Sequence, residues 1–155
     1  METPEGVDLN EREQLKLYAR LVKWYDEFPF TDEPQKSLRY YFNNSLFCHS
    51  DAYWLYSMIR EFRPRQIIEV GSGFSSAVML DTNELFLDNS IKFTFIEHYP
   101  DRLLSILRSS DQNTCNIHKD IVQNISTEIF AELQAGDFLF IDSSHVVKIG
   151  SDVLH

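Results

Sequence analysis

The segment Ile67–Ser76, IIEVGSGFSS, holds the residues whose types and spacing point most directly to chemistry. Gly71 and Gly73 let the backbone turn sharply and let a ligand approach without a Cβ atom in the way. A helix that begins near Ser75 would direct its free N–H groups toward the same place. Two glycines alone are compatible with any turn, so the interpretation depends on the residues around them. The candidate cofactor contacts in this turn are Glu69, Gly71, Ser72, Gly73 and Ser75.

Three further acidic residues end or follow stretches that are predicted to be strands. Glu97 lies about 25 residues beyond Gly71, in the region where a carboxylate can accept hydrogen bonds from both hydroxyls of a ribose. Asp120 is a candidate acceptor for the amino group of an adenine, and Asp142 would face the reacting end of a ligand. Ligands bind beyond the carboxyl ends of parallel strands. These acids and the turn together predict a site for an adenosine-containing cofactor.

The elements that must position these residues alternate along the chain from Gln66 onward. Runs rich in β-branched and aromatic residues predict strands, and helical spacing of apolar residues predicts helices. The expected strands are 66–70, 91–97, 114–118 and 137–142, and the expected helices between them are 75–87, 101–108 and 125–133. This order predicts an α/β fold, a Rossmann-like parallel sheet with helices on both faces. The last strand, DFLFID, is expected to be buried.

Before Pro64, the apolar spacing predicts helices at 10–27 and 50–62, the second with Ser50 as its N-cap. We therefore expect residues 1–63 to form an N-terminal helical extension or cap. Residues 64–155 are expected to form a partial Rossmann-like cofactor-binding domain, and the two parts to make a single structural unit. A chain of 155 residues, 43% of them hydrophobic, is long enough for one domain with a core.

Composition argues against several classes of partner and location. The formal net charge is −10 and the sequence has no run of Lys and Arg, which argues against nucleic acid and against an anionic membrane surface. Two cysteines make no disulfide framework of the secreted type. No apolar run approaches the roughly 20 residues of a membrane span, and the first residues lack the apolar region of a signal peptide. We expect a cytoplasmic protein that acts on a small molecule.

Two classes of cofactor fit these features. A dinucleotide site asks for a third glycine, and Ser76 stands at that position, which weakens this interpretation without excluding it. The acidic Glu69, two residues before Gly71, favours the other class, which is S-adenosylmethionine.

Four parts of the sequence, within about residues 50–152, resemble class I S-adenosylmethionine-dependent methyltransferases. They resemble the first motif of that family, its ribose-binding acid, its adenine-contacting position and its fourth strand. In chain order they are Glu69-x-Gly71-x-Gly73, Glu97, Asp120 and 138–142. The resemblance implies S-adenosylmethionine as the cofactor and methyl transfer to a small molecule as the reaction.

The segment Phe140–His145, FIDSSH, resembles a bacterial subgroup of small-molecule methyltransferases, which is loosely similar to metal-dependent O-methyltransferases. In the metal-dependent enzymes the Asp that ends the fourth strand is a metal ligand. The resemblance thus implies that Asp142 binds a divalent cation such as Mg²⁺ and that His145 is a base. Asp142 and His145 are the candidate catalytic residues.

The sheet of this family has seven strands, whereas this sequence ends soon after the fourth predicted strand. We therefore expect the C-terminal strands to be missing and the activity of the chain as given to be incomplete. An uncovered last strand would expose the apolar edge Phe138–Ile141, so we expect a homodimer through this edge. Two alternatives remain: a non-catalytic module that binds S-adenosylmethionine or S-adenosylhomocysteine, and a fragment of a NAD-dependent oxidoreductase.

Overall fold

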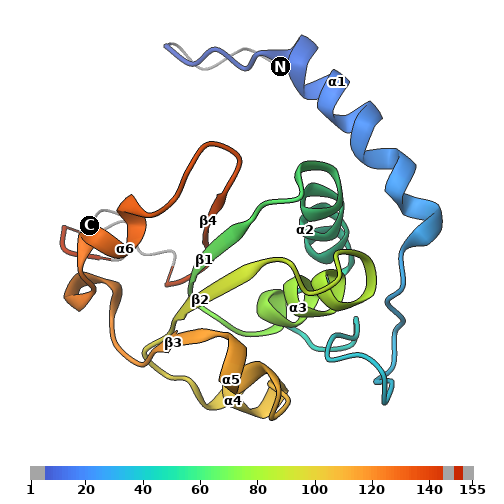
Figure 1. Ribbon diagram of the computed structural model, residues 1–155. Helices are drawn as coiled ribbons and strands as arrows, with labels where there is room; N and C mark the ends of the chain where they lie inside the picture. The colour runs from blue at the N-terminus through green and yellow to red at the C-terminus, as the bar shows by residue number, and fades with distance from the viewer. Residues whose placement is uncertain (1–5, 145–148, 152–155) are drawn as a thin grey trace.

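The computed structural model describes residues 6–144 and 149–151, and a sheet of four parallel strands lies at its centre (Figure 1). The strands are β1 Gln66–Val70, β2 Lys92–Ile96, β3 Asn116–His118 and β4 Phe138–Ile141, in the spatial order β3-β2-β1-β4. The chain adds β2 and β3 on one side of β1 and then crosses back to place β4 on its other side. This reversal between β1 and β4 is where open α/β sheets bind ligands. The expected α/β fold with a parallel sheet is confirmed.

Helices cover both faces of the sheet, as expected. Alternate residues of a strand point to opposite faces, so Ile67 of β1 packs into one apolar cluster and Ile68 into another. The larger cluster lies against α2 His49–Phe62 and α3 Phe74–Phe86. The smaller one is completed by η2 Val122–Asn124, α6 Thr127–Ala131 and their neighbours. Two short helices, α4 Asp101–Ile106 and α5 Asp111–Thr114, connect β2 to β3.

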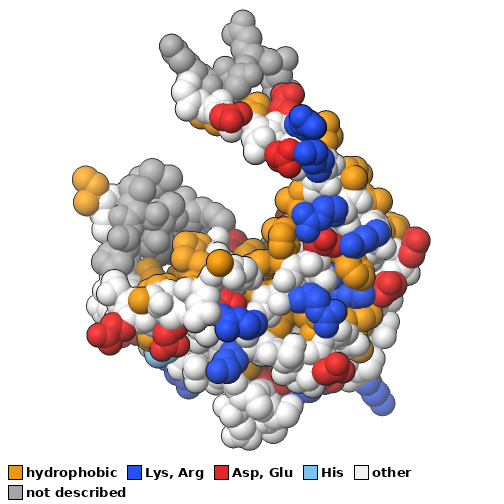
Figure 2. Space-filling model, turned by 45° about the horizontal axis from the view of Figure 1, so that its top comes forward, with side chains coloured by type: hydrophobic (Ala, Val, Ile, Leu, Met, Phe, Trp, Pro, Cys, Tyr) orange, Lys and Arg blue, Asp and Glu red, His pale blue; other side chains and the backbone are white. Residues whose placement is uncertain are grey.

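The chain begins with α1 Glu11–Leu21, which continues directly as the 3-10 helix η1 Val22–Glu27. α1 projects from the body of the protein as an arm, and hydrophobic side chains are exposed in the hollow beneath it (Figures 1 and 2). Leu21 is the buried residue of α1. Arg20 and Lys23 hold the base of the arm to α2 through ion pairs with Glu61, each 2.7 Å long. No helix in the described ranges is long and apolar enough to cross a membrane.

Residues 28–48 form an irregular segment that shares the core of the sheet. Phe30, Tyr40 and Phe47 are buried in the same cluster as Ile67 of β1. Their rings meet one another and their neighbours mostly edge to face, as in the contact of Phe30 with Tyr40 at 4.9 Å between ring centres. The residues before β1 therefore pack together with the sheet rather than apart from it.

An ion cluster centred on Arg39 fixes this segment to the helices. The Arg39 guanidinium, 4% exposed, lies 2.6 Å from Asp81 of α3 and 2.8 Å from Asp111 of α5. The backbone N–H groups of Arg39 and Tyr40 also donate to Asp81, at 2.7 and 2.9 Å. One buried carboxylate of α3 thus holds both the side chain and the backbone of the segment.

Several local expectations differ from the structure. α2 begins at His49, with Cys48 rather than Ser50 at the N-cap position and without a side-chain cap. The second half of the expected N-terminal helix is the 3-10 helix η1. β4 is an edge strand whose Leu139 and Ile141 are 47% and 50% exposed. This differs from the buried strand expected for DFLFID, but it agrees with the exposed apolar edge expected at Phe138–Ile141. The reason is that β4 pairs on one side only, and its alternate side chains point away from the main core.

Candidate functional site

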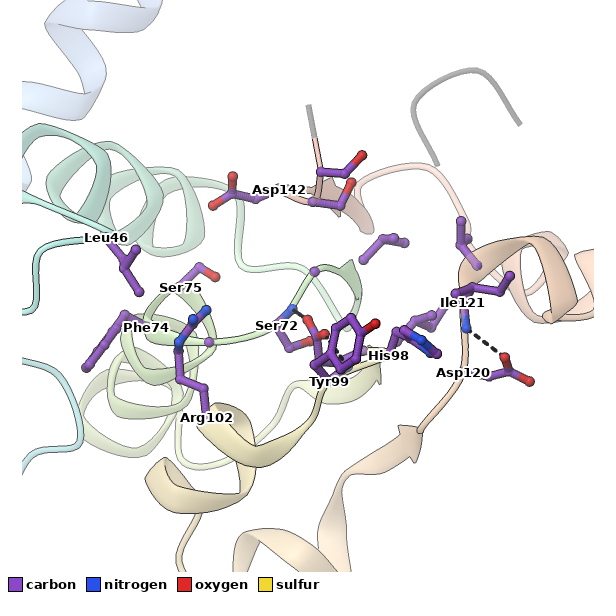
Figure 3. Close-up of a pocket in the computed structure, with 18 of the residues that line it drawn as sticks. Leu46, Ser72, Phe74, Ser75, His98, Tyr99, Arg102, Asp120, Ile121 and Asp142 are labelled. Carbon is purple, nitrogen blue, oxygen red and sulfur yellow. Dashed lines mark hydrogen bonds between the residues drawn. The ribbon is translucent and has the colours of Figure 1, made fainter. Parts of the chain in front are cut away.

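A cleft of about 590 Å³ opens at the carboxyl ends of β1, β2 and β4 and at the start of α3 (Figure 3). Such a volume is in the range of small-molecule sites. The cleft brings together Gly71 and Asp142, which lie 71 positions apart in the chain (142 − 71), because the parallel strands end at the same edge. The predicted residues that line it are Gly71, Ser72, Gly73, Ser75, Glu97, Asp120 and Asp142.

The turn after β1 is tied to the neighbouring strand ends. The N–H of Gly71 donates to the carbonyl of Ile96 in β2, and the N–H of Asp142 donates to the carbonyl of Val70, each at 3.0 Å. Gly71 has φ of +87°, and a Cβ atom placed on it would lie 2.2 Å from the carbonyl oxygen of Asp142. Backbone conformation and close packing therefore both require glycine at this position.

Glu69 lies under this turn and does not line the cleft. It has no exposed surface, and its two oxygens accept hydrogen bonds from the hydroxyls of Ser75, at 2.5 Å, and of Ser76. The Ser76 hydroxyl oxygen in turn accepts the N–H of Gly73 at 3.0 Å. The predicted cofactor residue Glu69 is thus placed to support the turn from below.

Burial sets the protonation of Glu69. It raises the pKa of the carboxyl to about 7, against the lowering effect of the Ser75 and Ser76 hydroxyls, and the nearby Asp142 carboxylate raises it further. Ser76 occupies the position of the third glycine of a dinucleotide motif. Here its side chain is fully buried between α3 and β1 and completes the hydrogen bonds of Glu69.

Glu97 lies in the cleft with its carboxylate held in place by backbone groups. One oxygen accepts the N–H of Ser72 and the other accepts the N–H of Tyr99, both at 2.8 Å. Each carboxylate oxygen has two lone pairs. Glu97 therefore keeps acceptor capacity for hydroxyls of a ligand while its orientation is fixed.

Asp120 lies in the same cleft, beyond the end of β3, and is also oriented. Its Oδ1 accepts from the side-chain amide of Asn124 at 2.9 Å and from the N–H of Ile121 at 2.8 Å (Figure 3). These two hydrogen bonds lower the pKa of the Asp120 carboxyl. Ile121 and Val122 add apolar surface beside it. An aspartate next to an apolar wall suits a flat ring that carries an amino group.

Asp142 lines the cleft at the end of β4, but the metal predicted there does not fit the donors of the described residues. Within residues 6–144 and 149–151, no group of three or more His, Cys, Asp or Glu side chains is placed to hold a metal ion. Mg²⁺ needs several oxygen ligands in octahedral geometry, and one carboxylate does not supply them. His145, the other predicted catalytic residue, lies outside the described residues.

Two serine hydroxyls show that the cleft has polar capacity left for a ligand. The buried Oγ atoms of Ser143 and Ser151, which both line the cleft, make no hydrogen bond with the described part of the chain. Buried polar atoms are nearly always paired with protein, water or ligand. The oriented acids, the glycine turn and these hydroxyls fit a polar nucleoside-type cofactor.

Sequence reasoning missed several residues that line the cleft. Leu46 and Phe47 come from the irregular segment 28–48, which carries no pattern that would place it at the site. Tyr99 and Arg102 follow β2. The rule about strand ends indicates this loop, but the residue types single out only its acidic residue, Glu97. Arg102 could have been noticed as the first cation after Glu97.

The fold and the site define a Rossmann-like α/β protein with a cleft at its topological switch point. No family model matches the chain. An uncharacterized protein of Archaeoglobus fulgidus is 39% identical over 97 residues, which are 61% of this chain and 44% of that protein. The chain therefore spans less than half the length of this curated relative.

A solved structure named cmcI-N160 SAH has a similar fold. It matches 94% of this chain and 67% of its own chain, with a TM-score of 0.51 and 16% sequence identity. The likeness shows that the two share a fold. Its name carries SAH, the abbreviation of S-adenosylhomocysteine.

Proposed function

We propose that this chain binds S-adenosylmethionine and serves methyl transfer to a small molecule. The observation that carries the proposal is the convergence of the glycine turn, Glu97 and Asp120 on one cleft. Two of these parts are oriented together, because Glu97 accepts the N–H of Ser72 in the turn itself. The structural neighbour whose name carries SAH supports the proposal at the level of the fold.

Each part of the cleft has a place in this proposal. Asp120 accepts a hydrogen bond from the adenine amino group, with Ile121 and Val122 against the ring. Glu97 accepts the ribose hydroxyls. The amino-acid end of the cofactor follows the turn from Gly73 to Gly71 and ends near Asp142. In this arrangement the carboxylates accept hydrogen bonds from the cofactor. A cleft lined by carboxylates also suits a ligand with a positively charged sulfonium.

S-adenosylmethionine supplies a methyl group already activated on a sulfonium, so alignment of the acceptor with that methyl group is the main requirement. The residues of this chain hold and orient the cofactor. Leu46 and Phe47 line one side of the cleft and exclude water from it. Asp142 is the described residue that we assign to accept a proton from the methyl acceptor, as a general base. No metal takes part in this proposal.

The test is calorimetry of the chain with S-adenosylmethionine, S-adenosylhomocysteine and NAD. We expect binding of the first two and weak or absent binding of NAD. Glu97→Ala should weaken S-adenosylhomocysteine binding at least about tenfold, because a charged acceptor of two hydroxyl groups is lost. Glu128→Ala, at an exposed position on α6, is the matched control and should change nothing.

Two outcomes would contradict the proposal. Unchanged affinity of Glu97→Ala for S-adenosylhomocysteine would show that Glu97 does not bind the ribose. Tighter binding of NAD than of S-adenosylhomocysteine would indicate a dinucleotide-binding protein instead. Transfer of a labelled methyl group to a panel of small acceptors then separates a methyltransferase from a module that binds the cofactor without turnover.

A further inference from the structure

Arg102 is the one Lys or Arg among the described residues that line the cleft. The carboxylates that line it are those of Glu97, Asp120 and Asp142. Arg102 is the second residue of α4, and its side chain extends along the first turn of α3 (Figure 3). Its guanidinium makes no hydrogen bond or ion pair with any residue that the structure describes. A guanidinium without a protein carboxylate partner, placed at a cleft, is available to an anionic group of a ligand.

The position of Arg102 depends on Gly73. A Cβ atom on Gly73 would lie 3.1 Å from Cδ and 3.6 Å from Nη1 of Arg102. Gly73 has φ of 175°, outside the left-handed region. The close approach of the Arg102 side chain favours glycine at this position. The glycine leaves room for a cation against the turn.

The two glycines of the turn have different neighbours. Gly71 packs against the backbone of Asp142, and Gly73 packs against the side chain of Arg102. An α-amino acid carries a carboxylate and an ammonium group on one carbon. A ligand with an amino-acid end that lies along this turn would find the Arg102 side chain beside Gly73.

We propose that Arg102 binds the α-carboxylate of the amino-acid moiety of the cofactor. This inference rests on the proposed function, in which that moiety lies along the turn. Guanidinium and carboxylate match as planar, bidentate partners. The N–H groups at the start of α3 and the positive end of its dipole add to the attraction for a negative charge. Arg102 is then the residue that distinguishes an amino-acid end with a carboxylate from one that lacks it.

The experiment measures binding of three ligands by calorimetry to the wild-type chain and to Arg102→Gln. S-adenosylhomocysteine carries the carboxylate, and 5′-methylthioadenosine lacks the whole amino-acid end. Decarboxylated S-adenosylmethionine lacks the carboxylate but keeps the amine. Arg102→Gln should weaken the binding of S-adenosylhomocysteine about tenfold or more. It should leave the affinities for the other two ligands within about twofold of wild type.

Two further variants separate this role from a structural one. Arg102→Lys keeps the charge but not the planar guanidinium group. Its affinity for S-adenosylhomocysteine should therefore lie between those of wild type and Arg102→Gln. Lys119→Gln removes an exposed cation next to Asp120 that does not line the cleft, and should leave all three affinities unchanged. We expect the midpoint of thermal unfolding of Arg102→Gln to be close to that of wild type, because Arg102 is exposed.

The results that would overturn the inference differ from those that would overturn the proposed function. Equal weakening of all three ligands would show that Arg102 shapes the turn and does not bind the carboxylate. Unchanged S-adenosylhomocysteine affinity in Arg102→Gln would exclude the contact while leaving the proposed function in place. If wild type bound none of the three ligands, both proposals would be wrong.

Discussion

Glu69 shows how a residue can serve a binding turn without touching the ligand cleft. Its carboxyl has no exposed surface and accepts hydrogen bonds from the hydroxyls of Ser75 and Ser76 in the first turn of α3. Through Ser76 it is also connected to the N–H of Gly73. The start of the helix and the turn before it are therefore held by one buried carboxyl.

This burial predicts a pH-dependent stability. The pKa of Glu69 is raised from 4.5 to about 7, so the folded protein binds the proton more tightly than the unfolded chain does. The resulting stability is fully present below about pH 4.5 and is lost as the pH rises through about 7. The free energy of unfolding of wild type, relative to that of Glu69→Gln, should fall by on the order of 3 kcal/mol across this range.

Urea unfolding of both proteins between pH 4.5 and 7.5 measures this difference. Other titrating groups are common to the two proteins and largely cancel, with Asp142 as the neighbour that interacts most directly. Glu128→Gln, an exposed glutamate, is the control and should follow wild type at every pH. A constant difference between wild type and Glu69→Gln would contradict the prediction.

At this scale the sequence located some residues and not others. Glu97, Asp120 and Asp142 were placed at the cleft because the alternation of strands and helices fixes where parallel strands end. The side on which Glu69 lies follows from the pleat of β1, where it shares a face with Ile67. Arg102 could not be placed, since its direction depends on how α4 packs beside α3, which no local pattern specifies.

The turn between β1 and α3 is the element on which the site depends. Gly71→Ala combines an unfavourable left-handed conformation with a Cβ atom 2.2 Å from the carbonyl of Asp142. We expect it to displace the end of β4, lower the midpoint of thermal unfolding and abolish binding of S-adenosylhomocysteine. Calorimetry and thermal unfolding measure both effects.

Gly136 offers a matched control for this substitution. It has φ of +93°, close to that of Gly71, but an added Cβ atom would have no neighbour within 4 Å. Gly136→Ala should therefore carry only the conformational cost, about 1–2 kcal/mol. The excess destabilisation in Gly71→Ala then reports the clash with β4. Equal effects of the two substitutions would show that close packing at Gly71 is unimportant.

Elements were easier to predict than their connections. Each strand appeared within about two residues of its expected limits, because β-branched and aromatic runs bounded by polar residues are strong local signals. The contact of Arg39 with Asp81 and Asp111 was not predicted. Arg39 lies 42 positions from Asp81 in the sequence, and a charged residue in an irregular segment gives no indication of its partner.

At the scale of the whole molecule, the free edge of β4 stands out. Beside it runs a second groove of about 690 Å³, which shares Leu46, Phe47 and Asp142 with the cleft at the strand ends. Trp54, Leu139 and Ile141 are among the other residues that line it. The backbone of an edge strand offers unpaired N–H and C=O groups to another strand. Exposed apolar side chains beside that edge add to the tendency to associate.

We therefore expect this chain to self-associate through β4, with a second copy as the partner. Sedimentation velocity over a range of concentrations measures it. Leu139→Lys combined with Ile141→Lys places two charges at the edge and should shift the population toward monomer. Leu85→Lys, at a similarly exposed position on α3, should leave association unchanged. A wild-type chain that remains a single monomeric species would contradict the prediction.

The placement of Trp54 has an optical consequence. The protein has two tryptophans, and Trp54 is 42% exposed at the groove beside β4, with its ring 5.9 Å from that of Tyr18 in the projecting α1. Trp24 is held by a hydrogen bond to Glu61 and lies against the Arg60 guanidinium. Indole emission moves to shorter wavelengths when water is replaced by apolar surroundings. The fluorescence of Trp54 should therefore report coverage of the β4 groove, against a steady contribution from Trp24.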